Sequence, residues 1–175
     1  DPDGTPTHVL IDCGVILGQP YAAEGIAATV IHREPLVAVM SPRDGLAGRN
    51  AVGPADLHGR ELFVTPQVWG FRERLEQGLD RAGVVPASVT ECGSLALLAR
   101  CVAAGLGVGL APRLAAAALS RGGELALAPW AKDGFTAAVT VMRLAGRDPG
   151  PAETTFLRCL GEAVAEASSK AAPPP

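Results

Sequence analysis

The side chains best placed to do chemistry lie in one stretch, residues 91–112, with the sequence ECGSLALLARCVAAGLGVGLAP. Ser94 precedes an apolar pattern at helical spacing, and its hydroxyl can accept from the free N–H groups of the next turn. Gly105 ends this helix where a left-handed residue is needed, and the apolar run 108–111 predicts a buried strand. Such a strand–helix–strand unit places a free helix N-terminus at the carboxyl end of a sheet, which is where open α/β sheets bind ligands.

The other residues that could do chemistry lack the neighbours they would need. The histidines are scattered without the spacing of metal ligands: His8, His32 and His58. Asp12 and Glu91 are isolated carboxylates on separate predicted strands, with no nucleophile nearby in the sequence. The glycine-spaced run 105–109 follows a helix rather than a strand, so it is no dinucleotide-binding fingerprint. These patterns favour surface and packing roles.

The composition and charge of the chain limit the kinds of molecule that it could bind. The net charge of −3 and the absence of a clustered basic face argue against binding of nucleic acid by this chain itself. No apolar run is long enough to span a bilayer. The four cysteines form no C-x-x-C pair, which predicts buried small hydrophobes in a reducing compartment and hence the cytoplasm. The chain opens Asp-Pro-Asp without Met, so we expect a piece cut from a longer protein.

The elements that must position the 91–112 stretch alternate strand and helix from residue 62 to residue 128, which predicts a mostly parallel sheet. We expect strands over residues 10–17, 26–32, 36–40, 62–64, 88–91, 108–111, 125–128 and 137–142. We expect a helical turn over 54–57 and further helices over 68–82, 113–120 and 151–168. Glu34-Pro35 separates the second strand from the third. Three early strands with almost no helix between them cannot form a parallel lobe alone.

Several motifs, taken in order, resemble the effector-binding domain of LysR-type transcriptional regulators. They are EPLVAVMSP at 34–42, LAGR at 46–49, the turn at 56–57, LFV at 62–64, the stretch from Gly93-Ser94 to Pro112, and the closing helix around 156–160. Each motif is loose, but their order and separations over roughly residues 9–165 make a specific signal.

The resemblance implies an α/β fold of the type-2 periplasmic-binding-protein kind, in which two Rossmann-like subdomains are joined by two crossover strands. The crossovers would be residues 36–42 and 127–141. We expect a partial subdomain I over 9–40, subdomain II over 41–130, a return strand and C-terminal helix over 131–168, and a disordered tail over 169–175. The family's winged helix-turn-helix and the start of subdomain I have no counterpart in the sequence, so we expect the first subdomain to be truncated.

The resemblance also implies which residues line the cleft between the subdomains. They are Thr65, Pro66, Gln67 and Trp69 after the first strand of subdomain II, Gly93 and Ser94 at a helix start, and Ser41 and Pro42 at the hinge. Hydroxyls, an amide and exposed N–H groups suit a carboxylate or another anion. Trp69 either closes over an apolar ring or begins a buried helical turn. Ser94 is a plain cap, a ligand contact, or both.

The function implied is a ligand-sensing regulatory domain that binds a small-molecule co-inducer and controls DNA binding by the full-length protein. The implied partners are further copies of the chain, as a dimer or tetramer, and operator DNA through an N-terminal domain outside this sequence. No cofactor, metal, membrane or catalytic role is expected. An alternative with the same fold is the solute-binding protein of a transporter, which would carry a signal peptide or lipid anchor upstream.

Overall fold

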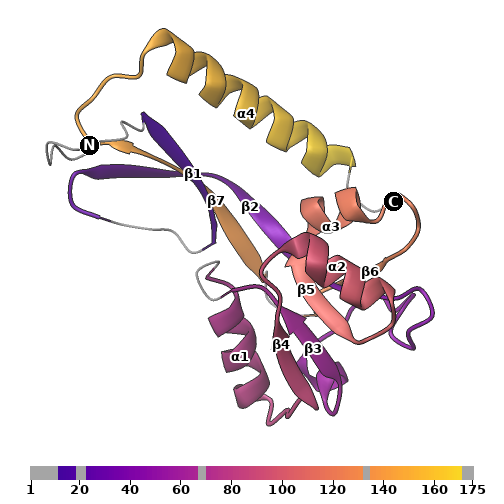
Figure 1. Cartoon of the computed structure of the whole chain (residues 1–175). Helices are drawn as coiled ribbons and strands as arrows, with labels where there is room; N and C mark the ends of the chain where they lie inside the picture. Colours follow the sequence, from indigo (N-terminus) through magenta and orange to yellow (C-terminus); the bar gives the residue numbers. More distant parts are fainter. Residues whose placement is uncertain (1–11, 19–22, 67–69, 132–134, 171–175) are drawn as a thin grey trace, which may run out of the picture.

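The computed structural model describes residues 12–18, 23–66, 70–131 and 135–170 (Figure 1). In chain order the elements are β1 (Cys13–Gly18), β2 (Ile26–Met40), the 3-10 turn η1 (Pro54–Leu57), β3 (Glu61–Val64), α1 (Arg72–Arg81), β4 (Ser88–Glu91), α2 (Leu95–Ala103), β5 (Val108–Pro112), α3 (Arg113–Leu119), β6 (Ala126–Pro129), β7 (Thr136–Leu144) and α4 (Pro151–Lys170).

The described strands form one sheet in the order β1-β7-β2-β5-β3-β4, with β6 also paired to β2. Only β3 pairs in parallel, with β4 on one side and β5 on the other; every other pair is antiparallel. The expected mostly parallel sheet is therefore confined to β3, β4 and β5. The reason is that β2 runs antiparallel to all three of its partners, β5, β6 and β7.

Strand β2 joins the two parts of the molecule (Figure 1). It is a single strand of 15 residues, so the expected break at Glu34-Pro35 is wrong. Up to Pro35 it pairs with β7, and from Leu36 onward it pairs with β5 and β6. The proline thus stands where the partner strand changes, and the next N–H, of Leu36, donates to the carbonyl of Phe135 at 2.9 Å. Proline is tolerated in a strand at such an irregular point of the ladder.

The return path runs through β6 and β7, which both lie antiparallel to β2. Two crossover strands therefore connect the β1–β7 part of the sheet with the β3–β5 part, as the resemblance implied. The first crossover is longer than expected, because the whole of β2 takes part. Figure 1 shows α4 beside the β1–β7 part, and α1 and α2 beside the β3–β5 part.

The core is centred on β5, whose five residues are all buried. A Cβ added at Gly109 would lie 2.6 Å from Leu98 Cδ2 and 3.0 Å from Val39 Cγ2, so α2 packs directly against the strand. Only glycine permits this approach. Gly105 has φ +80°, which confirms the expected left-handed end of α2.

Helix α4 is held at its first turn by charge. The carboxylate of Glu153 is buried and lies 2.7 Å from Arg147 Nη2 and 3.7 Å from Arg143 Nε on β7. The helix continues to Lys170 and so includes the first two residues of the expected disordered tail, and residues 171–175 lie outside the described part. None of the described helices combines the length and the apolar character that crossing a membrane requires.

Candidate functional site

The carboxyl ends of the parallel strands bring two of the candidate loops together. In the register of the sheet Val64 faces Glu91, and the N–H of Cys92 donates to the carbonyl of Val64 at 2.8 Å. The loop that begins with Thr65 and the loop that contains Gly93 and Ser94 therefore start side by side. This juxtaposition follows from parallel pairing, which aligns the carboxyl ends of neighbouring strands at one edge.

Thr65 carries the clearest local signal. Its side chain is 1 % exposed, and its hydroxyl Oγ1 has no hydrogen-bond partner within the described structure. Leaving a buried hydroxyl unpartnered costs about 1–3 kcal/mol, and such groups in a native fold call for an explanation such as a missing ligand or water. Thr65 lines a narrow void, too small to hold a water molecule, together with Phe71 and Arg72 at the start of α1.

Ser94 caps α2, as expected from its position in the sequence. Its Oγ accepts from the N–H of Leu97 at 3.2 Å. The other N–H groups of the first helical turn have no acceptor within the helix and, with the helix dipole, favour an anion. Gly93 is exposed, and a Cβ there would meet nothing within 4 Å. The backbone at this helix start is therefore open to a ligand.

Arg72 was not among the residues expected at the site. The sequence pattern indicates a solvated helix face, but in the structure Arg72 lines the same narrow void as Thr65 at the end of β3. Its Nε donates to Glu76 at 2.7 Å and its Nη1 pairs with Glu91 at the end of β4. The hydrogen bond to Glu76 raises the pKa of Arg72, burial opposes this, and the charges of Glu76 and Glu91 raise it further. A permanent cation therefore stands at this edge.

Glu34 is a second residue whose role the sequence did not reveal. It is 2 % exposed, and its Oε1 accepts from the N–H of Leu114 at 2.7 Å, at the start of α3. Its Oε2 lies 2.9 Å from Nε2 of His32, which in turn lies 3.3 Å from the hydroxyl of Ser168 on α4. The Glu34 carboxylate therefore accepts a hydrogen bond at the N-terminus of α3 and, through His32, connects β2 to α4 as well.

Ser41 and Pro42 lie at the other end of the sheet, which corrects their expected hinge position. Leu36 faces Pro112 and Val39 faces Gly109, so Ser41 lies beyond the amino end of β5. Five residues of strand separate Ser41 from Leu36, a distance of about 17 Å.

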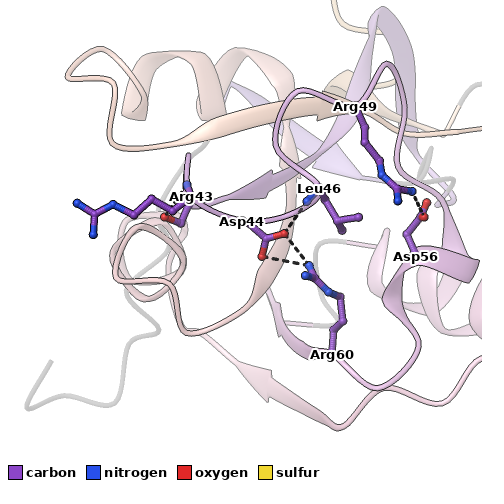
Figure 2. A network of polar contacts seen from close by, with 7 residues as sticks. Arg43, Asp44, Leu46, Arg49, Asp56 and Arg60 are labelled. Carbon is purple, nitrogen blue, oxygen red and sulfur yellow. Dashed lines mark hydrogen bonds and ion pairs between the residues drawn. The ribbon is translucent and has the colours of Figure 1, made fainter.

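Ser41 and Pro42 instead line a separate surface hollow of about 920 Å³ next to the C-terminal end of α2. Figure 2 shows the adjoining loop, where Asp44 accepts from Arg60 at 2.8 Å and from the N–H of Leu46. Arg43 points away from this network (Figure 2). These contacts brace the turn after β2 and lie apart from Thr65.

The remaining candidates are less well defined. Pro66 follows Thr65 and is half-buried, whereas Gln67 and Trp69 lie outside the described residues. The described ranges contain no group of three or more His, Cys, Asp or Glu side chains that could hold a metal ion. The candidate site therefore comprises Thr65, Arg72, Gly93, Ser94 and the first turn of α2.

Comparison with known proteins places this geometry in context. The family model described as the LysR substrate binding domain matches residues 10–165. A curated protein of Escherichia coli (strain K12), "Uncharacterized HTH-type transcriptional regulator YfiE", is 28% identical over 132 residues, which cover 75% of this chain and 44% of that protein. The chain thus spans less than half the length of this relative.

Solved structures share the fold. The regulatory domain of CcmR from Synechocystis PCC6803, in complex with 2-PG, has a TM-score of 0.71 and 21% identity, over 87% of this chain and 73% of that one. The BenM effector binding domain with its effector benzoate has a TM-score of 0.68 and 18% identity, over 94% and 73%. The OxyR C206 mutant of Corynebacterium glutamicum has a TM-score of 0.74 and 22% identity, over 92% and 51%. The periplasmic-binding-protein-like architecture expected from the sequence is confirmed.

Proposed function

The chain belongs to the LysR substrate binding domain family, and from this premise we propose that its effector is a small carboxylate or similar anion bound at the carboxyl ends of β3 and β4. The family is one of transcriptional-regulator domains and not an enzyme family. The chain is accordingly an effector-binding domain of the LysR type. We propose both the chemical class of this effector and the residues that hold it.

The observation that carries the proposal is the unpartnered hydroxyl of Thr65, which is buried at the end of β3, next to the loop that leads into α2. A carboxylate at this edge would accept from Thr65 and from free N–H groups at the start of α2. The charge of Arg72 is already balanced by Glu76 and Glu91, so the hydroxyl and the N–H groups would hold the anion. Benzoate, the effector of the similarly folded BenM domain, is itself a carboxylate.

The crossover strands supply the route by which binding reaches the rest of the protein. A ligand held between subdomain II and subdomain I would favour a closed arrangement, with β2 and β7 as the flexing connections. The effect on DNA binding cannot exceed the difference in ligand affinity between the two arrangements. In this proposal the full-length protein is a cytoplasmic homo-oligomer that binds operator DNA through a separate N-terminal domain.

The subdomain limits remain part of this proposal: a partial subdomain I over 9–40, subdomain II over 41–130, and the return strand and helix over 131–168. Ser41 and Pro42 are left out of the effector site, because they lie beyond the far end of β5. Gln67 and Trp69 stay in it as proposed contacts from the loop that follows Thr65.

Calorimetric titration of the full gene product tests the ligand class. A panel of small carboxylates is compared with the neutral amides of the same skeletons. At least one carboxylate is expected to bind ten times more tightly than its amide, and Thr65→Ala is expected to weaken that binding without unfolding the domain. Equal affinities for acid and amide, or binding that Thr65→Ala leaves unchanged, would overturn the proposed site.

The coding sequence upstream of Asp1 tests the regulator against its alternative. A winged helix-turn-helix followed by a long linker helix supports the regulator. A signal peptide followed by a complete first lobe would contradict it and indicate a solute-binding protein of a transporter.

A further inference from the structure

A second hollow, of about 910 Å³, lies between one face of α1, the η1 turn and the residues Trp130, Ala131 and Phe135. Its volume is within the range of small-molecule pockets. Its lining includes Pro54, Arg74, Gly78, Arg81, Trp130 and Phe135. Thr65 and Ser94 are not among its lining residues, so this hollow is separate from the proposed effector site.

Two cations face the hollow from the same side of α1. Arg74 and Arg81 are seven residues apart, which places them two turns apart on one helix face. Arg74 is fixed, because its Nη1 donates to the carbonyl of Thr136 at 2.9 Å and its guanidinium carbon lies 4.7 Å from the ring centre of Phe135. Arg81 is exposed and forms no ion pair with a carboxylate in the described ranges.

Among the described residues of the lining, Asp56 is the one carboxylate, and it pairs elsewhere. Asp56 pairs with Arg49 (Figure 2). It also accepts from the N–H of Gly53 at 2.9 Å. Its charge and lone pairs are therefore engaged away from α1. Among the described lining residues, Arg74 and Arg81 thus have no carboxylate partner, which favours an anionic occupant.

An aromatic wall completes the hollow. The rings of Trp130 and Phe135 lie 5.8 Å apart, tilted by 37°, and both side chains are half-buried. Between the two arginines stands Gly78, a residue that costs roughly 0.5–1 kcal/mol in a helix interior. A Cβ there would have Pro54 Cγ at 3.9 Å as its nearest neighbour, so any longer side chain would extend into the open space. The glycine leaves room between cation and ring.

We propose that this hollow binds a planar aromatic carboxylate, with the carboxylate on Arg81 and the ring against Trp130 and Phe135. Guanidinium groups bind carboxylates in a bidentate manner, and flat apolar rings pack on aromatic side chains. The proposal rests on the described residues of subdomain II and the first residues of the return crossover, and it does not depend on the effector site at Thr65.

The probe is 2-naphthoate, followed by calorimetry and by NMR chemical shifts on this chain and on the full gene product. We expect one-to-one binding that is at least ten times tighter than binding of 2-naphthalenemethanol, the neutral analogue. Arg81→Gln should weaken it at least fivefold, and Gly78→Leu should abolish it by filling the space. Arg121→Gln, an exposed arginine outside the hollow, serves as the matched control and should leave the affinity unchanged.

Gly78→Leu changes the interior of a helix and can alter folding as well as binding, so Arg81→Gln, at an exposed residue, is the decisive variant. Thr65→Val distinguishes binding in this hollow from binding at the proposed effector site. Loss of naphthoate binding in Thr65→Val, with no change in Arg81→Gln, would assign the ligand to the strand-end site and overturn this inference. Absence of saturable binding at millimolar concentration would overturn it as well. Failure here would leave the effector proposal standing, because that site uses different residues.

Discussion

Replacing Thr65 by valine should stabilise the protein and weaken its response to effector at the same time. Valine has nearly the same shape as threonine but no hydroxyl. Because Thr65 is 1 % exposed and its Oγ1 has no partner, the folded state gains nothing from the hydroxyl when the ligand is absent. Most substitutions of buried residues destabilise, so an increase in stability here is a discriminating result.

The expected magnitude follows from the desolvation of that hydroxyl. A buried polar group without a partner costs about 1–3 kcal/mol, and this cost disappears in Thr65→Val. For a domain of this size each kcal/mol raises Tm by about 2–4 °C. Loss of a hydrogen bond to a charged ligand costs about 1.5–3 kcal/mol, which corresponds to an affinity roughly ten- to a hundredfold lower.

Urea unfolding followed by circular dichroism measures the first effect, and calorimetric titration of the best-binding carboxylate measures the second. Thr140→Val is the matched control: Thr140 on β7 is also fully buried, and its Oγ1 also has no partner. It should stabilise by a similar amount and leave effector affinity unchanged. A destabilised Thr65→Val protein, or one that binds effector as tightly as the wild type, would refute the reasoning.

Three further substitutions or treatments test the packing around the site. Leu98→Ala opens a cavity against β5 and should lower the free energy of unfolding by about 2–5 kcal/mol in urea titrations; a loss under 1 kcal/mol would contradict the packing of α2 on this strand. Glu34→Ala leaves a helix N–H at α3 without its acceptor and should cost about 1–3 kcal/mol, whereas unchanged stability would show that water replaces the carboxylate. Burial, aided by neighbouring Cys101, raises the pKa of the Cys92 thiol. The folded protein is therefore expected to lose stability as alkaline pH rises from the pKa of this thiol in the unfolded chain to its higher pKa in the fold. Timed alkylation with iodoacetamide should modify exposed Cys159 before Cys92 by mass spectrometry, and equal rates would count against this burial.

Elements whose signals are local could be predicted from the sequence. The strand over 88–91, the turn over 54–57 and the helix capped by Ser94 and ended by Gly105 all occur as expected. Each depends on a few residues that are close together in the sequence and that determine the local backbone conformation and its hydrogen bonds. The family resemblance added the order of the elements and the two crossovers, which local patterns alone do not contain.

Features that depend on partners distant in the chain could not be predicted. Pro35 looked like a break, but it lies inside β2 because the strand exchanges β7 for β5 at that residue. Arg72 looked like part of a solvated face, although Glu91, nineteen residues away, draws it to the strand ends. Ser41 was expected at the hinge, yet antiparallel pairing of β2 with β5 carries it to the opposite edge.

A crystal structure of the full gene product with its best-binding carboxylate tests the central claim most directly. The account predicts a carboxylate oxygen within about 3.2 Å of Thr65 Oγ1 and a second contact to an N–H group at the start of α2. A carboxylate bound elsewhere, with the Thr65 hydroxyl still unpartnered, would contradict it.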